Sequence, residues 1–219
     1  MVIIFPMLRR CWVPWILVLT IALSILLRPV DPMRGEKAHI IEDSDQAKLK
    51  EVFQLERIYS VVKFHKKDLD EQSAWKLAST IQKESRKYSL DPLLVLAVIR
   101  VESSFRHQAV SRKGARGLMQ IRPFVARSLL PQINLGRRHE VKMLLDDPIL
   151  NIKIGVFYLN RLKQRFRDMR LALTAYNWGP TEIQNRLHQK QWLPTRYARK
   201  VLAAYHVYSH HPSDISLIP

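Results

Sequence analysis

Residues 91–120, DPLLVLAVIRVESSFRHQAVSRKGARGLMQ, indicate both the fold class and the candidate site of this chain. Asp91 and Pro92 are residue types preferred at the N-cap and first position of a helix. The apolar run after them predicts a buried helix that ends at about Glu102. A loop with two glycines and no acidic residue then leads to Gln120. The segment therefore offers one carboxylate, which suits proton transfer and poorly suits a metal, since a metal requires several ligands.

Helical patterns continue through most of the chain. We expect further helices over 46–66, 71–88, 169–177 and 180–188, one after a second Asp-Pro pair at 147–148, and a last one capped by Thr195. No segment of the domain alternates apolar and polar residues as a half-exposed strand would. The chain also has only 6 glycines in 219 residues, which disfavours a turn-rich sandwich. We therefore predict a mainly α fold.

The composition is that of a globular chain with a strongly basic surface. Apolar residues make up 47%, enough for a core and too many for a disordered chain. The formal net charge of +17 suits either a solvated face or a polyanionic partner, such as nucleic acid, anionic lipid headgroups or an acidic cell-wall polymer. A single cysteine, Cys11, excludes an intramolecular disulfide, so the fold depends on its core.

The N-terminal region predicts a membrane anchor. Residues 1–10 would be a short cytoplasmic N-terminus and residues 11–27 the transmembrane anchor, because the apolar run WVPWILVLTIALSILL is roughly 24 Å long as a helix. Arg28-Pro-Val-Asp-Pro32 does not resemble a signal-peptide cleavage site, so an uncleaved anchor is favoured over a signal peptide. We predict a linker and stalk helix over 28–69, the main domain over 70–209 and a tail over 210–219.

Several side chains are candidates for chemistry around Glu102. Burial of Glu102 at the end of an apolar helix would raise the pKa of its carboxyl toward neutrality, as a general acid requires. Ser103 lacks the adjacent base and the turn motif of a nucleophile, so orienting Glu102 or closing the helix are its expected roles. Amide and aromatic groups that suit sugar binding occur at Gln120, Tyr176 and Asn177, although each alone is also typical of a surface or turn position, and Met119 of a core.

Taken in order, these motifs resemble the lytic transglycosylases with a soluble-type, lysozyme-like (SLT) catalytic domain. The resemblance covers roughly residues 75–208. Its motifs are Glu102-Ser103 with Phe105, Ala109-Val-Ser111, Gly114-Ala-Arg-Gly-Leu-Met-Gln120, Asp147-Pro148 with Asn151-Ile152, Ala175-Tyr-Asn177 with Gly179-Pro180, and Thr195-Arg-Tyr197 with Lys200-Val201. The chain departs from the family at Trp178, where a small residue is frequent, and at Arg106-His-Gln108, where Pro or Asn is common.

The resemblance implies a lysozyme-like helical domain that cleaves the β-1,4 bond between N-acetylmuramic acid and N-acetylglucosamine in peptidoglycan and leaves a 1,6-anhydro end. It implies that Glu102 acts as acid and then base and that Tyr197 positions it through a hydrogen bond. The glycan subsites would be lined by Ser103, Met119, Gln120, Tyr176 and Asn177.

The same resemblance implies peptidoglycan strands and the membrane as partners, with a cell-wall or secretion complex left open. Nucleic acid, metal and cofactor are not expected. The implied location is the cell envelope, with the inner membrane as anchor and the catalytic domain on the periplasmic side.

Three alternatives remain at this point. A muramidase would use water and yield a reducing end. A basic, membrane-tethered protein that binds nucleic acid would need clustered Arg and Asn on a recognition helix, whereas the basic residues here are scattered. A catalytically inactive glycan-binding module is disfavoured by the presence of Glu102 and Tyr197.

Overall fold

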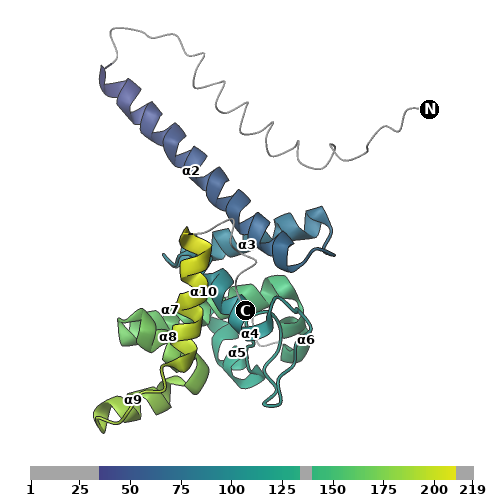
Figure 1. Ribbon diagram of the computed structural model, residues 1–219, viewed down its shortest axis with the longest axis vertical. Coiled ribbons are helices and arrows are strands. Elements are labelled where there is room, and N and C mark those ends of the chain that lie inside the picture. Colours follow the sequence, from purple (N-terminus) through teal and green to yellow (C-terminus); the bar gives the residue numbers. More distant parts are fainter. Residues whose placement is uncertain (1–34, 134–139, 211–219) are drawn as a thin grey trace, which may run out of the picture. The chain divides into compact units, whose positions relative to one another are not determined.

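The computed structural model describes residues 35–133 and 140–210, and this part of the chain is built of helices (Figure 1). In chain order they are α2 (Gly35–His65), α3 (Glu71–Lys87), α4 (Pro92–Ser103), α5 (Pro123–Leu129), the 3-10 helix η1 (Leu130–Ile133), α6 (Val141–Asp146), α7 (Pro148–Phe166), α8 (Met169–Trp178), α9 (Pro180–His188) and α10 (Arg196–His210). In the described ranges, β-structure is limited to isolated bridges in the loop after α4. The prediction of a mainly α chain is confirmed.

The chain divides into two compact units, Met1–Arg57 and Ile58–Pro219. What the structure describes of the first unit is the beginning of α2. This helix starts at Gly35, earlier than the start predicted at residue 46, and its Phe53 is 51% exposed. The predicted anchor at 11–27 and nearly all of the tail predicted at 210–219 lie outside the described residues. Among the described helices, none has the length and hydropathy required to cross a bilayer.

Helix α4 forms the centre of the second unit, Ile58–Pro219. The Asp91 carboxylate accepts a 2.8 Å hydrogen bond from the backbone N–H of Leu93, and Pro92 occupies the first turn, as the sequence predicted. Residues 92–99 are all buried, because α4 packs against α3 and α10. The helix therefore delivers its C-terminal turn, with Glu102, from within the core.

Helices α7 and α8 begin with the same kind of cap as α4. Asp147 accepts hydrogen bonds from Ile149 and Leu150 at the start of α7, and Asp168 accepts one from Leu171 at the start of α8. Helix α7 packs on α3 and α8, and α8 packs in turn on α10. The short helices α5 and α6, which the sequence patterns did not predict, pack against α7. This arrangement brings the ends of α4 and α8 toward the start of α10.

Candidate active site

The chain reverses immediately after Glu102. Ser104 caps α4 with φ of 50°, and Phe105 follows with φ of 63°, so two consecutive residues with side chains adopt the left-handed conformation. Such a conformation costs on the order of 1 kcal/mol or more per residue unless the surroundings compensate. Phe105 is buried and anchors the reversal in the core. The turn leaves Glu102 half-buried at the helix end.

The environment of Glu102 favours a protonated carboxyl near neutrality. Burial raises the pKa of Glu102 to about 7, and the hydroxyl of Tyr197 opposes this shift by donating a 2.6 Å hydrogen bond to Oε1. Among the described residues no second acidic group contributes to this pKa. A carboxyl with this pKa populates both its acid and its base form at neutral pH.

Two tyrosines connect Glu102 to the loop. The rings of Tyr176 and Tyr197 stack with centroids 6.4 Å apart and an interplanar angle of 6°. The Tyr176 hydroxyl donates a 2.8 Å hydrogen bond to the carbonyl of Met119. Burial, and then the charge of Glu102, raise the pKa of both phenols well above 10. The structure thus brings together Glu102, Tyr197, Tyr176 and the backbone of Met119.

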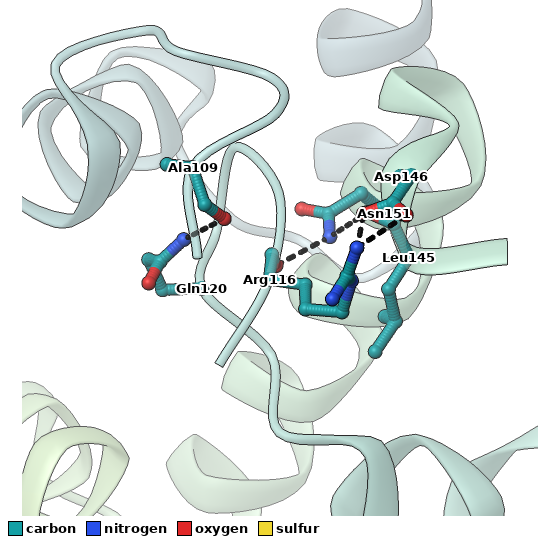
Figure 2. Close-up of polar contacts among 6 residues, drawn as sticks. All are labelled: Ala109, Arg116, Gln120, Leu145, Asp146 and Asn151. Atoms are coloured by element: carbon teal, nitrogen blue, oxygen red, sulfur yellow. Dashed lines mark hydrogen bonds and ion pairs between the residues drawn. The ribbon is translucent and has the colours of Figure 1, made fainter. Parts of the chain in front are cut away.

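The loop from α4 to α5 folds back on itself around Gln120. This residue has φ of 47°, and its side-chain Nε2 donates 2.9 Å hydrogen bonds to the carbonyls of Ala109 and Gly117. Figure 2 shows the bond to Ala109, which closes the loop. The amide nitrogen of Gln120 is therefore committed to the loop, and the amide oxygen is the atom that it can offer to a ligand.

Asn151, on α7, holds the other side of this loop (Figure 2). Its Nδ2 donates to the carbonyls of Arg116 at 2.9 Å and Leu145 at 2.8 Å, and its Oδ1 accepts from the Met119 N–H at 2.8 Å. The side chain is fully buried. A Cβ added to Gly117, which has φ of 79°, would collide with Asn151, so this position requires glycine.

An ion pair adds a second attachment between the loop and the short helix α6. Arg116 donates hydrogen bonds of 2.8 and 2.7 Å to the two carboxylate oxygens of Asp146 (Figure 2). The sequence motifs contained Asn151, but its role went unpredicted, because two of its three partners, Arg116 and Met119, lie far away along the chain. The available signal in the sequence was a polar Asn between apolar residues, shortly after the Asp147-Pro148 helix start.

Ser103 and Met119 are two of the residues that the resemblance predicts to line the glycan subsites. Both are buried. The hydroxyl of Ser103 donates to the carbonyl of Ile99 in its own helix at 3.2 Å. The side chain of Met119 packs against Gly155, where an added Cβ would overlap it. The side chains of these two residues therefore pack in the interior beside Glu102 and Gln120, their neighbours in sequence.

Asn177 and Trp178, at the end of α8, lie on the surface. Asn177 is exposed, and Trp178 is 48% exposed with the guanidinium carbon of Arg186 5.6 Å from its ring centroid. The chain then turns at Gly179, whose φ is 93°. Asn177 therefore follows Tyr176 directly and presents its amide to solvent.

The described residues form a helical domain with one half-buried glutamate, Glu102, that accepts a hydrogen bond from a tyrosine. Residues 79–198, more than half of the chain, match the family model described as the transglycosylase SLT domain, and the chain belongs to this family. It is 36% identical over 135 residues to a membrane-bound lytic murein transglycosylase C of Shigella sonnei, covering 58% of this chain and 37% of that protein. The chain spans about a third of the length of the curated relatives that it matches.

Two solved structures have a similar fold. One is the lytic transglycosylase Slt of Pseudomonas aeruginosa, crystallised as an inactive mutant with glutamine in place of a glutamate. It has a TM-score of 0.54 and 26% identity, over 64% of this chain and 24% of that one. The other is the 70 kDa soluble lytic transglycosylase of Escherichia coli, with a TM-score of 0.58 and 22% identity, over 78% of this chain and 32% of that one. The prediction of an SLT-type, lysozyme-like fold is thereby confirmed.

Proposed function

We propose that this protein is a peptidoglycan lytic transglycosylase, which cleaves the β-1,4 bond between N-acetylmuramic acid and N-acetylglucosamine and leaves a 1,6-anhydro end. The observation that carries the proposal is Glu102, half-buried, with a pKa of about 7 and a 2.6 Å hydrogen bond from Tyr197. Membership of the SLT family and the names of the relatives support the same activity. The inactivity of the Slt mutant, which has glutamine in place of glutamate, supports one essential acid.

The proposed reaction uses Glu102 twice. Its carboxylic acid first donates a proton to the glycosidic oxygen, and the bond between that oxygen and the anomeric carbon of the muramoyl residue breaks. The resulting carboxylate then removes the proton from the C6 hydroxyl of the same sugar, and O6 bonds to the anomeric carbon. The proton ends on Glu102, no water is consumed, and the carboxyl is ready for another cycle. A pKa near neutrality suits both steps, because neither form is rare.

A single acid is sufficient for this chemistry because the substrate supplies the nucleophile. Retaining and inverting glycosidases normally place two carboxyl groups beside the bond. The pKa of Glu102 is explained by burial and by Tyr197, without a contribution from another described acid. We infer that the exposed amide of Asn177 and the amide oxygen of Gln120 bind the sugars. The net charge of +17 complements the anionic stem peptides of peptidoglycan.

Product analysis of purified peptidoglycan sacculi tests the proposal. Digestion by the wild-type protein should release muropeptides that are lighter by one water than the reducing-end products of a muramidase. Mass spectrometry separates the two. Release of reducing-end products would replace the proposed reaction with hydrolysis, the second candidate function.

Replacing Tyr197 with phenylalanine should lower kcat by roughly ten- to a hundredfold, since a hydrogen bond to a charged group is worth about 1.5–3 kcal/mol. The hydroxyl stabilises the carboxylate and so lowers the pKa of Glu102. Its removal should move the alkaline limb of the kcat/KM profile to higher pH. Tyr205→Phe on the same helix is the matched control. An unchanged pH profile in Tyr197→Phe would show that Tyr197 does not tune Glu102.

We propose further that the segment at 11–27 anchors the protein in the inner membrane and that the catalytic domain faces the periplasm. The apolar run and the relatives named membrane-bound support this arrangement. A reporter that is active only outside the cytoplasm, fused after Pro219, should be active in cells. A reporter signal confined to the cytoplasm would contradict the arrangement, because the substrate lies on the other side of the membrane.

A further inference from the structure

The backbone reversal after Glu102 depends on side chains far away in the sequence. Ser104 and Phe105 hold unfavourable positive φ angles of 50° and 63°. Conformations of this kind persist where surrounding contacts enforce them. Phe105 lies three residues after Glu102 and is buried. Contacts that hold the Phe105 ring therefore also hold the backbone turn at which α4 ends.

The ring of Phe105 is covered by His65, the last residue of α2. The two rings stack with centroids 4.5 Å apart and an interplanar angle of 12°. Burial, and then the positive charge of Arg100, lower the pKa of His65 to about 4. The imidazole is therefore neutral in ordinary conditions and packs on Phe105 without burying a charge.

His65 is itself held in place by Tyr208. Its Nε2 shares a 2.7 Å hydrogen bond with the hydroxyl of Tyr208, a buried residue near the end of α10. The same helix carries Tyr197, which bonds Glu102. Helix α10 thus contacts the catalytic turn at two points, directly through Tyr197 and indirectly through Tyr208, His65 and Phe105. Figure 1 shows α10 running beside α4, in agreement with their close packing.

Both members of the His65–Tyr208 pair lie outside residues 79–198, the segment matched by the SLT family model. Phe105 and Glu102 lie inside it. The segment that defines the family is therefore braced, at its catalytic turn, by residues that precede and follow it in this chain.

We propose that His65 and Tyr208 are positioning residues of the active site, which hold the Phe105 turn and through it the carboxyl of Glu102. This inference rests on the proposed function. Loss of their hydrogen bond releases the imidazole from Phe105, and the turn then relaxes toward less strained backbone angles. Glu102 moves with the end of α4, and small misplacements of a catalytic group cost large factors in rate.

Three variants of the full chain test the pair: Tyr208→Phe, His65→Phe and the double variant. Tyr208→Phe and His65→Phe each keep a ring and remove the shared hydrogen bond. Each should lower kcat on sacculi about tenfold and change KM less than twofold. Because both variants remove the same bond, their effects should not add, and the double variant should show little further loss; a double-mutant cycle measures this coupling.

Tyr205→Phe is the matched control. It lies on α10 as well, and its hydroxyl donates a 2.7 Å hydrogen bond to Asp91, the N-cap at the opposite end of α4. The control removes a bond of the same length from the same helix, α10, but this bond leads to the start of α4 and away from Glu102. It should lower the melting temperature and leave kcat unchanged well below that temperature. A purely structural role of His65 and Tyr208 would give their variants this same behaviour and would overturn the proposal.

A measurement without turnover separates this inference from the proposed reaction. A carbon-13 titration of the Glu102 carboxyl should give a lower pKa in Tyr208→Phe than in the wild type, because the pKa is raised mainly by burial. An unchanged titration would overturn the positioning role, whatever product the enzyme makes. Reducing-end products from the wild type would instead reject the proposed reaction and leave the titration result intact.

Discussion

Glu102→Gln is expected to abolish the release of anhydro-muropeptides while the fold is retained. Glutamine has nearly the same shape as glutamate and still accepts the hydrogen bond from Tyr197, but it neither donates a proton to the glycosidic oxygen nor accepts one from the C6 hydroxyl. General acid–base catalysis contributes typically 10²–10⁴-fold, and here one group serves both steps. We therefore expect a fall in kcat of at least about 10³-fold, measured by mass spectrometry of digested sacculi.

The same variant should be more stable than the wild type at alkaline pH. Burial raises the pKa of Glu102 to about 7, so folding favours the protonated form. The wild-type protein consequently loses stability as the pH rises from the unfolded value, near 4.5, through 7, whereas glutamine does not ionise. The unfolding free energy of Glu102→Gln should exceed that of the wild type by at most about 3 kcal/mol above pH 7, and the difference should vanish below pH 4.5.

Glu140→Gln serves as the control, because it makes the same change at an exposed position. It should not alter the products. Anhydro products from Glu102→Gln at the wild-type rate would remove Glu102 from the proposed role. If the difference in unfolding free energy between Glu102→Gln and the wild type does not vary with pH, folding does not raise the pKa of Glu102.

Asn151→Ala is expected to cause the largest loss of stability. The side chain satisfies the N–H of Met119 and the carbonyls of Arg116 and Leu145 in the interior. Each buried polar group left without a partner costs about 1–3 kcal/mol. The expected loss is about 3–5 kcal/mol, a large part of the stability of a typical domain. Urea denaturation should show a lower midpoint, and kcat should fall as the Met119–Gln120 segment loses its attachment.

The control for this change is Asn185→Ala, which is also in a helix but exposed. Exposed substitutions usually stay within about 0.5 kcal/mol of the wild type. Since both variants exchange Asn for Ala in a helix, the difference between them isolates the three hydrogen bonds and the packing of Asn151. A loss below about 1 kcal/mol in Asn151→Ala would show that the loop is held by other contacts.

Most of the helices could be predicted because their starts are encoded locally. Asp91, Asp147 and Asp168 each cap the helix that follows, and at the first two a proline occupies the first turn. The short helices α5 and α6 have no side-chain cap, so they left no such signal and depend on packing against α7. Isolated helices of this length are unstable in water, and tertiary contacts decide whether they form.

The candidate site was predictable only in part, for a related reason. The position of Glu102 at the end of a buried helix follows from its apolar neighbours, which are adjacent in sequence. By contrast, the hydrogen bonds of Asn151 join it to backbone groups around 116–119, and no local pattern encodes such a pairing. The burial of Ser103 and Met119 likewise depends on which face of the chain the rest of the fold covers.

The stacked tyrosines have a consequence for how the candidate site responds to pH. Because burial keeps the pKa of Tyr176 and Tyr197 well above 10, neither phenol changes charge when the surrounding solution becomes moderately acidic or alkaline. In this trio only Glu102 gains or loses a proton in that range. A moderate fall in pH therefore increases the protonated fraction of Glu102, while the two tyrosines that position it keep the same charge.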